Sequence, residues 1–416
     1  MSDFIQRWPN AIVHVDADCF YVSCERLRRP ELHGKIVGVL SNQDACIVAK
    51  SYEAKALGIK TGTPVWDARK LCPDGIWLQP DFCYYGQMSR RLYRVLDDIS
   101  PEVEPYSIDE AYLSLNGLRG YHRRGYGEIG SLLQEKVRAM TGLPVSVGVA
   151  TTKTLAKLAS EKYKPYGLTV VDARGIEAFL DTCAVEEIPG IGSNRAALLH
   201  KFAIDSAGDF ARADRSQITR LLDKPGEQLW WELNGQAVLP LQMSAPAPKQ
   251  VAKTSSLGRV TGEKRRIWAM LSFHTFRLAA TLAGRSLQTK RLTVFLGQKD
   301  QSFAGETIKL PRHTDAYPAL LETARRVFAR HFRPNRLYRN CGVIAGDLAP
   351  VNLNQSDLFG DWEREEKQRR RALAVASANG TSGRGTIFPA VQLPIAKIKL
   401  KGVREARLLQ DVIAVA

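Results

Sequence analysis

Apolar and polar positions in the first 170 residues change between the period of a strand and the period of a helix. Residues 11–15 form a short β-rich apolar run that ends on Asp16, Ala17 and Asp18. This pattern predicts a buried strand with carboxylates at its C-terminal edge. Between residues 90 and 99, apolar side chains recur at the spacing of a helix. The mixture predicts an α/β or α+β layered domain.

A second acidic pair lies between two strand-like runs. Residues 103–108 and 111–115 are apolar and β-rich, and only Asp109 and Glu110 separate them. This spacing predicts a hairpin whose tip or bend carries adjacent acids. Residues 144–150 predict a further strand.

Two helices are predicted near these strands. Residues 47–57 have a helical pattern that stops at Gly58, a residue type that commonly ends helices. Residues 153–163 place their apolar side chains on one face. Thr151 or Thr152 can cap the start of that second helix.

The second half of the chain has different patterns. Residues 171–240 are helical in pattern, with Ile-Pro-Gly-Ile-Gly at 188–192 between two helical segments. Residues 242–252 are rich in Pro and Ala without periodicity, which predicts a semi-extended linker. The elements after it have the order β-α-β-β-α-β and cover residues 254–261, 264–283, 291–298, 302–310, 315–331 and 337–347. The predicted fold class is therefore α+β with several domains.

The charge of the chain favours a polyanionic partner. The 59 Lys and Arg against 43 Asp and Glu leave a formal charge of +16, as in proteins that bind nucleic acid or an anionic membrane surface. Between Lys253 and Asp347 there are 18 basic and six acidic residues, so most of the excess lies in the last predicted domain. No run approaches the roughly 18 apolar residues of a spanning helix, and residues 1–10 lack the apolar core of a signal peptide. We expect a soluble, cytoplasmic protein with no membrane partner.

Asp16, Asp109 and Glu110 are candidates for binding metal ions. If the two strand ends meet, these carboxylates supply the hard oxygen ligands that two Mg²⁺ ions about 4 Å apart require. Such a pair of ions activates an attacking oxygen and stabilises the leaving one. On these residues alone, the alternative of exposed turn residues stays open, because acids are common at strand ends.

Longer motifs surround these acids. They are Val-Asp-Ala-Asp-Cys-Phe-Tyr-Val-Ser-Cys-Glu at 15–25 and Tyr-Ser-Ile-Asp-Glu-Ala-Tyr at 106–112, followed by matching segments at 49–58, 146–157 and 188–192. Together they resemble the Y-family (translesion) DNA polymerases over roughly residues 11 to 350, in the expected order. Within that family, residues 39–44 and 383–387 are similar to the UmuC branch, the catalytic subunit of bacterial DNA polymerase V.

The resemblance implies a right-hand polymerase fold with an added DNA-binding domain. The implied division is a palm (11–19 and 83–170), fingers (20–82), a thumb with a helix-hairpin-helix (171–240), a linker (241–252), a little finger (253–348) and a C-terminal tail (349–416).

The resemblance also implies the catalytic metal ligands. Two Mg²⁺ ions would be bound by Asp16, Asp109, Glu110 and the backbone carbonyl of Ala17.

A nucleotide site is implied beside the metals. Tyr52, Lys55 and Lys164 would contact the triphosphate of the incoming deoxynucleotide. Tyr21 would be the steric gate that excludes a ribose 2′-hydroxyl, with Phe20 packed beside it. Lysines near an acid cluster supply the charge neutralisation that phosphoryl transfer needs, although Lys164 by itself is also compatible with an ordinary helix end.

Three positions bear on the branch of the family. The UmuC branch usually has Asn where this chain has Asp18 and lacks a tyrosine at the position of Tyr52, so these sites are more similar to DNA polymerase IV. Lys55 stands where many relatives have Arg. Lysine keeps the charge there but loses the bidentate fork.

Two motifs outside the acidic site predict binding partners. Gly190 and Gly192, in a sharp turn between helices, would present backbone N–H groups to a DNA phosphate; a plain helical connector is the alternative. Gln355, Leu358 and Phe359 resemble the sliding-clamp binding peptide of bacterial polymerases; the alternative is a tail that folds back on its own protein.

These features predict a template-directed, low-fidelity DNA polymerase that extends a primer 3′-hydroxyl past damaged bases. The implied partners are primer-template DNA, deoxynucleoside triphosphates and a sliding clamp, with UmuD-like subunits and a recombinase filament added by the UmuC resemblance. A polymerase IV-like role, a catalytically silent repair scaffold and a Mg²⁺-dependent nuclease stay open. The three retained acids argue against the scaffold, and a nuclease would leave the triphosphate contacts without a role.

Overall fold

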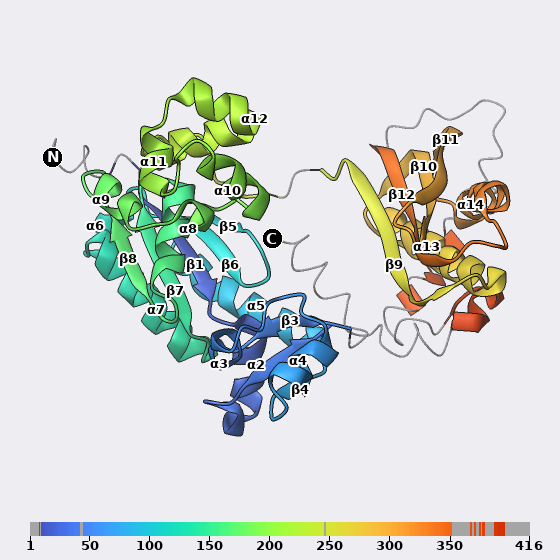
Figure 1. Cartoon of the computed structure of the whole chain (residues 1–416), viewed down its shortest axis with the longest axis horizontal. Coiled ribbons are helices and arrows are strands. Elements are labelled where there is room, and N and C mark those ends of the chain that lie inside the picture. The colour runs from blue at the N-terminus through green and yellow to red at the C-terminus, as the bar shows by residue number, and fades with distance from the viewer. Residues whose placement is uncertain are drawn as a thin grey trace. The chain divides into compact units, whose positions relative to one another are not determined.

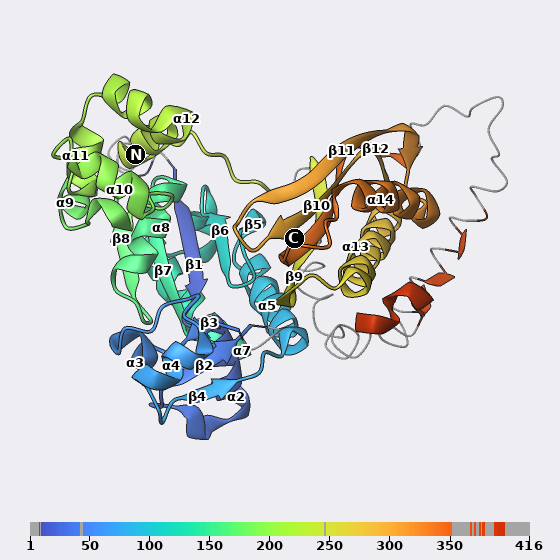
Figure 2. The ribbon, with the colours of Figure 1, turned by 45° about the vertical axis from the view of Figure 1, so that its right-hand side comes forward.

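The described chain forms two compact units. Figure 1 labels their helices and strands, and Figure 2 shows the same ribbon from a second direction. The computed structural model describes residues 8, 10–41, 45–244, 247–351 and 387–395, and scattered positions between the last two ranges (367, 370, 371, 374, 375, 377 and 378). One unit ends at residue 244 and the other begins at residue 247. Among the described residues, no helix is long and apolar enough to cross a membrane.

A five-stranded sheet in the order β5-β6-β1-β7-β8 is the frame of the first unit. Its central strand, β1, is antiparallel to both β6 and β7, and β8 joins parallel to β7. The strands are β1 (Ile12–Ala17), β5 (Val103–Pro105), β6 (Glu110–Ser114), β7 (Val145–Ala150) and β8 (Leu168–Val171). The apolar run predicted as a buried strand at residues 11–15 is therefore confirmed, and it is the strand on which the sheet is built.

One face of this sheet carries the main apolar core. Side chains alternate along a strand, so Val13 and Val15 of β1 point to the same face and pack in a core with residues of α5 and α7. The helices of this part are α5 (Phe82–Asp97), α6 (Leu118–His122) and α7 (Tyr126–Thr141). The helix predicted over residues 90–99 is the second half of α5, which begins eight residues earlier because the Asp81 side chain caps it.

The opposite face of β1 lies against α8 (Lys153–Lys162). The predicted cap is confirmed at Thr152, whose side chain accepts a hydrogen bond from the N–H of Leu155. Because of the strand alternation, His14 and Asp16 point toward α8 rather than into the main core. This orientation positions the candidate site.

Residues 20–78 form a small lobe with a three-stranded sheet in the order β3-β2-β4. β2 pairs antiparallel with β3 and parallel with β4. The elements are α2 (Phe20–Arg28), a 3₁₀ turn η1 (Pro30–Leu32), β2 (Val37–Leu40), β3 (Ile47–Lys50), α3 (Tyr52–Ala56), α4 (Val65–Leu71) and β4 (Ile76–Leu78).

The helix predicted over residues 47–57 is wrong in its first half. Ile47–Lys50 is strand β3, whose β-branched residues pair with β2. The helix begins only after Ser51, whose side chain accepts a hydrogen bond from the N–H of Ala54. Pairing with a distant strand therefore overrides the local helical pattern.

The last part of the first unit is helical, as its pattern predicts. These helices share an apolar core with α8. They are α9 (Ile176–Asp181), a 3₁₀ turn η2 (Val185–Glu187), α10 (Ser193–His200), α11 (Ala207–Arg212) and α12 (Arg215–Leu233).

The second unit is an antiparallel sheet in the order β11-β10-β12-β9, with α13 and α14 packed on its core. The predicted β-α-β-β-α-β order is confirmed, and η4 packs onto α13 with Ile395 in the core. Strand β9 begins at Gln250, which pairs with Gly346, so the last three residues of the predicted linker lie in the sheet. The elements are β9 (Gln250–Thr261), α13 (Lys264–Gly284), β10 (Leu287–Gln298), β11 (Phe303–Thr314), α14 (Tyr317–His331), β12 (Tyr338–Pro350) and a 3₁₀ segment η4 (Ala390–Ile395).

A buried carboxylate holds the chain where the first unit ends. Glu232 of α12 is 0% exposed. One of its oxygens accepts the N–H of Thr154 at 3.0 Å, in the first turn of α8. The other accepts the N–H groups of Val238 and Leu239 at 2.8 and 2.9 Å. This side chain ties α8, α12 and the segment that follows α12 together.

Glu232→Ala should lower the free energy of unfolding by about 3 kcal/mol, because it leaves three N–H donors without an acceptor, one of them buried and two partly buried. Glu227→Ala is the control. Glu227 lies in the same helix, is half-exposed and is 3.9 Å from its partner Arg215. Its loss should lower the free energy of unfolding by no more than about 0.5 kcal/mol. Urea denaturation of the full chain, followed by tryptophan fluorescence, measures both. Equal losses in the two variants would contradict the structural role of Glu232.

Candidate active site

Two neighbouring strands bring the three predicted acids to one edge of the sheet. Asp16 of β1 stands opposite Glu110 of β6 in the antiparallel register. The N–H of Ala17 donates to the backbone carbonyl of Asp109 at 3.0 Å. The predicted hairpin therefore exists, but its first strand ends at Pro105, so Asp109 closes the turn and Glu110 opens β6.

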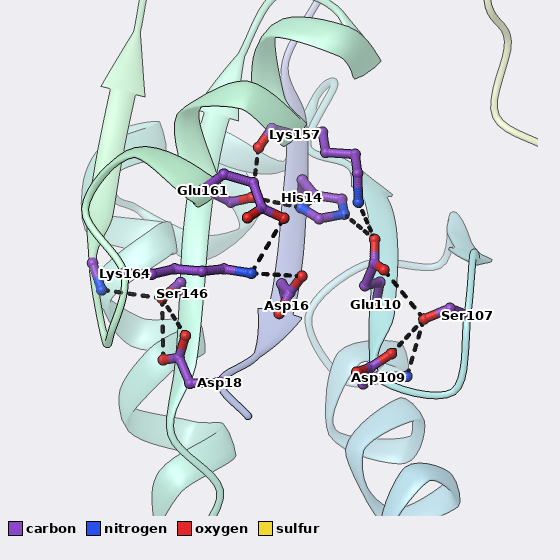
Figure 3. Close-up of polar contacts among 12 residues, drawn as sticks. His14, Asp16, Asp18, Ser107, Asp109, Glu110, Ser146, Lys157, Glu161 and Lys164 are labelled. Atoms are coloured by element: carbon purple, nitrogen blue, oxygen red, sulfur yellow. Dashed lines mark hydrogen bonds and ion pairs between the residues drawn. The ribbon is translucent and has the colours of Figure 1, made fainter. Parts of the chain in front are cut away.

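Each carboxylate at this edge has its own partner, as Figure 3 shows. Lys164 Nζ lies 2.8 Å from Asp16 Oδ2. Lys157 Nζ pairs with Glu110 Oε2. The Asp109 carboxylate accepts a hydrogen bond from the hydroxyl of Ser107. The cations of the chain itself therefore neutralise two of the three acids.

The three acids do not form a ready metal cage. In the part of the chain that the structure describes, no three His, Cys, Asp or Glu side chains form a group that could hold a metal ion as they stand. Each of the three carboxylates contacts a lysine or a serine of the chain. The donor set is nevertheless of the right chemistry, because it consists of the oxygens that hard divalent cations prefer.

Burial and nearby charges shift the pKa values of the three acids in different directions. Burial raises the pKa of Asp16 to about 7, although Lys164 opposes this shift. Burial also raises the pKa of Asp109. For Glu110, burial acts in the same direction, but the hydrogen bond from His14 and the charge of Lys157 outweigh it and lower the pKa to about 2. Asp16 is thus the acid that binds a proton most readily near neutral pH.

Sequence reasoning missed two residues of this site, His14 and Lys157. Burial lowers the pKa of His14 to about 4, so its imidazole is neutral at pH 7. Its place in the sequence was a usable signal, because a residue two positions before Asp16 shares its face of the strand. Lys157 lies inside a family motif, but only the packing of α8 on β1 shows that it reaches Glu110.

The three residues expected at the triphosphate have different contacts in the structure. Lys164 pairs with Asp16 and also lies 3.2 Å from Glu161, and these two acids raise its pKa against the opposing effect of burial. The hydroxyl of Tyr52 donates to Asp18 Oδ1 at 3.0 Å. Lys55 is exposed on α3, 5.9 Å from the centroid of the Tyr52 ring. Asp18 departs from the UmuC pattern. Its carboxylate also accepts a hydrogen bond from Ser146 of β7, so Asp18 links Tyr52 to the five-stranded sheet.

Tyr21 lies in an aromatic cluster at the start of α2. Its ring stacks on Tyr85 with centroids 4.4 Å apart, and the edge of Phe82 lies at 5.8 Å. Phe20 beside it is buried, with its ring centroid at 5.7 Å. Burial raises the pKa of the Tyr21 phenol to about 12. The neighbouring rings fix the position of the Tyr21 side chain.

The remaining predicted residues belong to two motifs, one before α10 and one outside the described residues. Gly190 has a φ of +93°, a conformation that favours glycine, and Gly192 is the N-cap of α10. Both glycines are exposed, as a phosphate contact requires. The residues predicted to bind a sliding clamp, Gln355, Leu358 and Phe359, lie outside the described residues.

Both halves of the chain match one protein family. A model described as "impB/mucB/samB family" matches residues 15–161, and the C-terminal domain model of the same family matches residues 248–358. Relatives include "Protein ImpB" of Salmonella typhimurium, 30% identical over 90% of this chain and 91% of the relative. "DNA polymerase IV" of Moorella thermoacetica is 32% identical over 92% of this chain and 96% of the relative.

A solved structure has a similar fold. It is a "Y-family DNA polymerase chimera", which superimposes with a TM-score of 0.68 and 25% sequence identity. The match covers 82% of this chain and 99% of that chain. The similarity therefore extends over almost the whole of the solved protein.

Binding of a divalent cation at this edge should be about tenfold weaker at pH 6 than at pH 8. With a pKa of about 7, Asp16 is mostly protonated at pH 6 and must release its proton before it can bind a cation. At pH 8 it is already ionised. Calorimetric titration with Mn²⁺ at the two pH values measures the ratio. Asp16→Asn should remove the pH dependence, and an equal affinity of the wild-type chain at both pH values would contradict the shifted pKa.

Proposed function

Because the chain belongs to the impB/mucB/samB family of Y-family translesion DNA polymerases, we propose that its own acidic edge carries out template-directed addition of deoxynucleotides to a primer. One observation supports this assignment more than any other. The antiparallel register of β1 and β6 puts Asp16 opposite Glu110, with Asp109 adjacent. Lys157 of α8 pairs with Glu110, and Lys164, just after α8, pairs with Asp16.

The metal chemistry is the first part of the proposal. The family uses divalent metal, and two Mg²⁺ ions would be held by the oxygens of Asp16, Asp109, Glu110 and the Ala17 carbonyl. When bound, the ions supply activation of the primer hydroxyl and neutralisation of phosphate charge. The contribution of the chain is to place these residues at the meeting ends of two paired strands, so that their oxygens lie near one another.

The lysines and Tyr52 would act on the nucleotide. Lys164 pairs with Asp16, and it would pair with the triphosphate when that carboxylate holds a cation. Lys55, exposed on α3 near the Tyr52 ring, would also contact the triphosphate. The Tyr52 hydroxyl has one hydrogen, which it gives to Asp18, so it must release Asp18 before it donates to a phosphate.

The proposal extends to the partners of the chain. Template DNA and deoxynucleoside triphosphates are the substrates of such an enzyme, and DNA as a substrate favours a cytoplasmic location. The basic excess between residues 253 and 347 supports DNA binding by the second unit through phosphate contacts. We further propose a sliding clamp at Gln355, Leu358 and Phe359, and UmuD-like subunits with a recombinase filament. Primer extension with each partner added in turn tests these assignments.

The branch of the family is a separate part of the proposal. Relatives of similar identity carry the names ImpB and SamB on one side and DNA polymerase IV on the other. The Asp18 and Tyr52 pair supports a polymerase IV-like nucleotide site, since the two side chains are bonded to each other. Activity of the chain without any accessory subunit would support the polymerase IV-like role, and a strict need for UmuD-like subunits would support the UmuC role.

Asp109→Ala combined with Glu110→Ala should reduce primer extension by at least about a thousandfold, because both acids would act on the transition state. The affinity for primer-template DNA should stay within about threefold, since phosphate contacts carry it. Gel-based extension and fluorescence anisotropy measure the two quantities.

The control for this variant is Asp97→Ala with Asp98→Ala, which removes the same charge from an exposed pair at the end of α5. It should extend primers like the wild type. A catalytic-pair variant that still extends primers would exclude these acids from the reaction. Degradation of labelled DNA by the wild type, in place of extension, would favour the nuclease.

Tyr21→Ala should lower the preference for deoxyribonucleotides over ribonucleotides by about a hundredfold or more. An aromatic wall beside the sugar excludes a 2′-hydroxyl by overlap, and compressing a close-packed contact costs more than losing it. Because Tyr21 stacks on Tyr85, the substitution also loses packing, so the ratio of the two incorporation rates is the quantity to measure.

Tyr84→Ala is the packing control, since Tyr84 stacks under Arg28 at 3.4 Å rather than on Tyr21. It should lower stability without changing the ratio. If Tyr21→Ala slows both nucleotide types equally, Tyr21 is a core aromatic and not the gate.

A further inference from the structure

His14 is a fully buried imidazole beside the acidic edge, and the proposed chemistry gives it no role. It is 0% exposed. Its Nδ1 lies 2.7 Å from the hydroxyl oxygen of Ser160 on α8. Its Nε2 lies 3.3 Å from Glu110 Oε2. His14 therefore lies in a line of three polar groups that runs from α8 to an acid of the site, as Figure 3 shows in part.

The hydrogens shared between Ser160, His14 and Glu110 can be assigned from what each group donates and accepts. A neutral imidazole has one N–H, and the Glu110 carboxylate is only able to accept. The contact with Glu110 therefore requires the hydrogen on Nε2. Nδ1 is then an acceptor, and the Ser160 hydroxyl donates to it. The direction of donation is Ser160 to His14 to Glu110.

The opposite arrangement is unfavourable. The Ser160 hydroxyl also lies 2.8 Å from the backbone carbonyl of Lys157, so it could donate there instead. His14 would then have to carry its hydrogen on Nδ1. The bare Nε2 would face Glu110 Oε2, and two acceptors would meet in a buried place, where an unpaired polar contact is costly.

The two oxygens of Glu110 are in different situations. Both His14 and Lys157 contact Oε2. Oε1 lies 3.5 Å from the hydroxyl of Ser107, which is long for a hydrogen bond. One oxygen is therefore anchored from the sheet and from α8, and the other has the long contact with Ser107 (Figure 3).

We propose that His14 is a positioning residue, which holds Oε2 of Glu110 through its Nε2–H so that Oε1 is presented to a divalent cation. The inference rests on the proposed role of Glu110 as a metal ligand. Lys157 holds the same oxygen, but its positive charge repels an arriving cation. The His14 imidazole holds this oxygen as well, from β1. Such supporting hydrogen bonds commonly affect metal affinity by ten- to a hundredfold.

The test compares His14→Leu with His14→Gln in the full chain. Both variants lose the ring contact with Tyr112, whose centroid lies at 4.7 Å. Only Gln keeps an N–H donor of similar reach. Mn²⁺ binding, followed by electron paramagnetic resonance of the free ion, should weaken about tenfold or more in His14→Leu and stay within about threefold of the wild type in His14→Gln.

Each result decides one question. Equal losses of Mn²⁺ affinity in both variants, or no loss in His14→Leu, would overturn the positioning role and leave the polymerase assignment intact. Glu110→Ala is the reference: if it binds Mn²⁺ like the wild type, Glu110 is not a ligand, and the proposed metal site fails instead.

Nitrogen-15 chemical shifts of His14 in the wild type are a measurement that needs no variant. A shift typical of Nε2–H supports the proposal, and an Nδ1–H form overturns it.

Discussion

The pairing of β1 between β6 and β7 is the constraint on which the rest of the structure depends. Strand alternation divides β1 into two sets of side chains. Val13 and Val15 enter the apolar core, and His14 and Asp16 face α8. A slip of one residue would exchange the two sets. The apolar core therefore specifies the register, and the register in turn puts Asp16 opposite Glu110.

This arrangement gathers negative charge in a partly buried place, and the chain compensates for it locally. Lys157 lies in α8, and Lys164 follows its end. Both pair with acids of the neighbouring strands. The compensation is incomplete at Asp16, whose burial still favours the protonated form. In the proposed function, the same lysines would neutralise the triphosphate while the acids hold metal.

In the proposed function, the two units would have different physical roles. The first unit has the rigid sheet that chemistry requires, while the excess of basic residues is concentrated in the second. Affinity for a phosphate backbone depends on the number of basic contacts rather than on one geometry. Charge can therefore be supplied by a separate unit, joined to the first by a short segment after Leu239, without disturbing the acidic edge.

The sequence by itself determined most of the elements and the acids that the proposed function uses. The central strand, the hairpin with Asp109 and Glu110, and the order of elements in the second unit follow from local periodicity, and the family motifs identify the chemistry. Only the tertiary structure decided that residues 47–50 form a strand, that Lys157 and His14 reach Glu110, and that Tyr52 is bonded to Asp18. These are contacts between residues far apart in the chain. A local pattern records the preference of a segment for helix or strand, whereas such contacts depend on where the packing of the core places each segment.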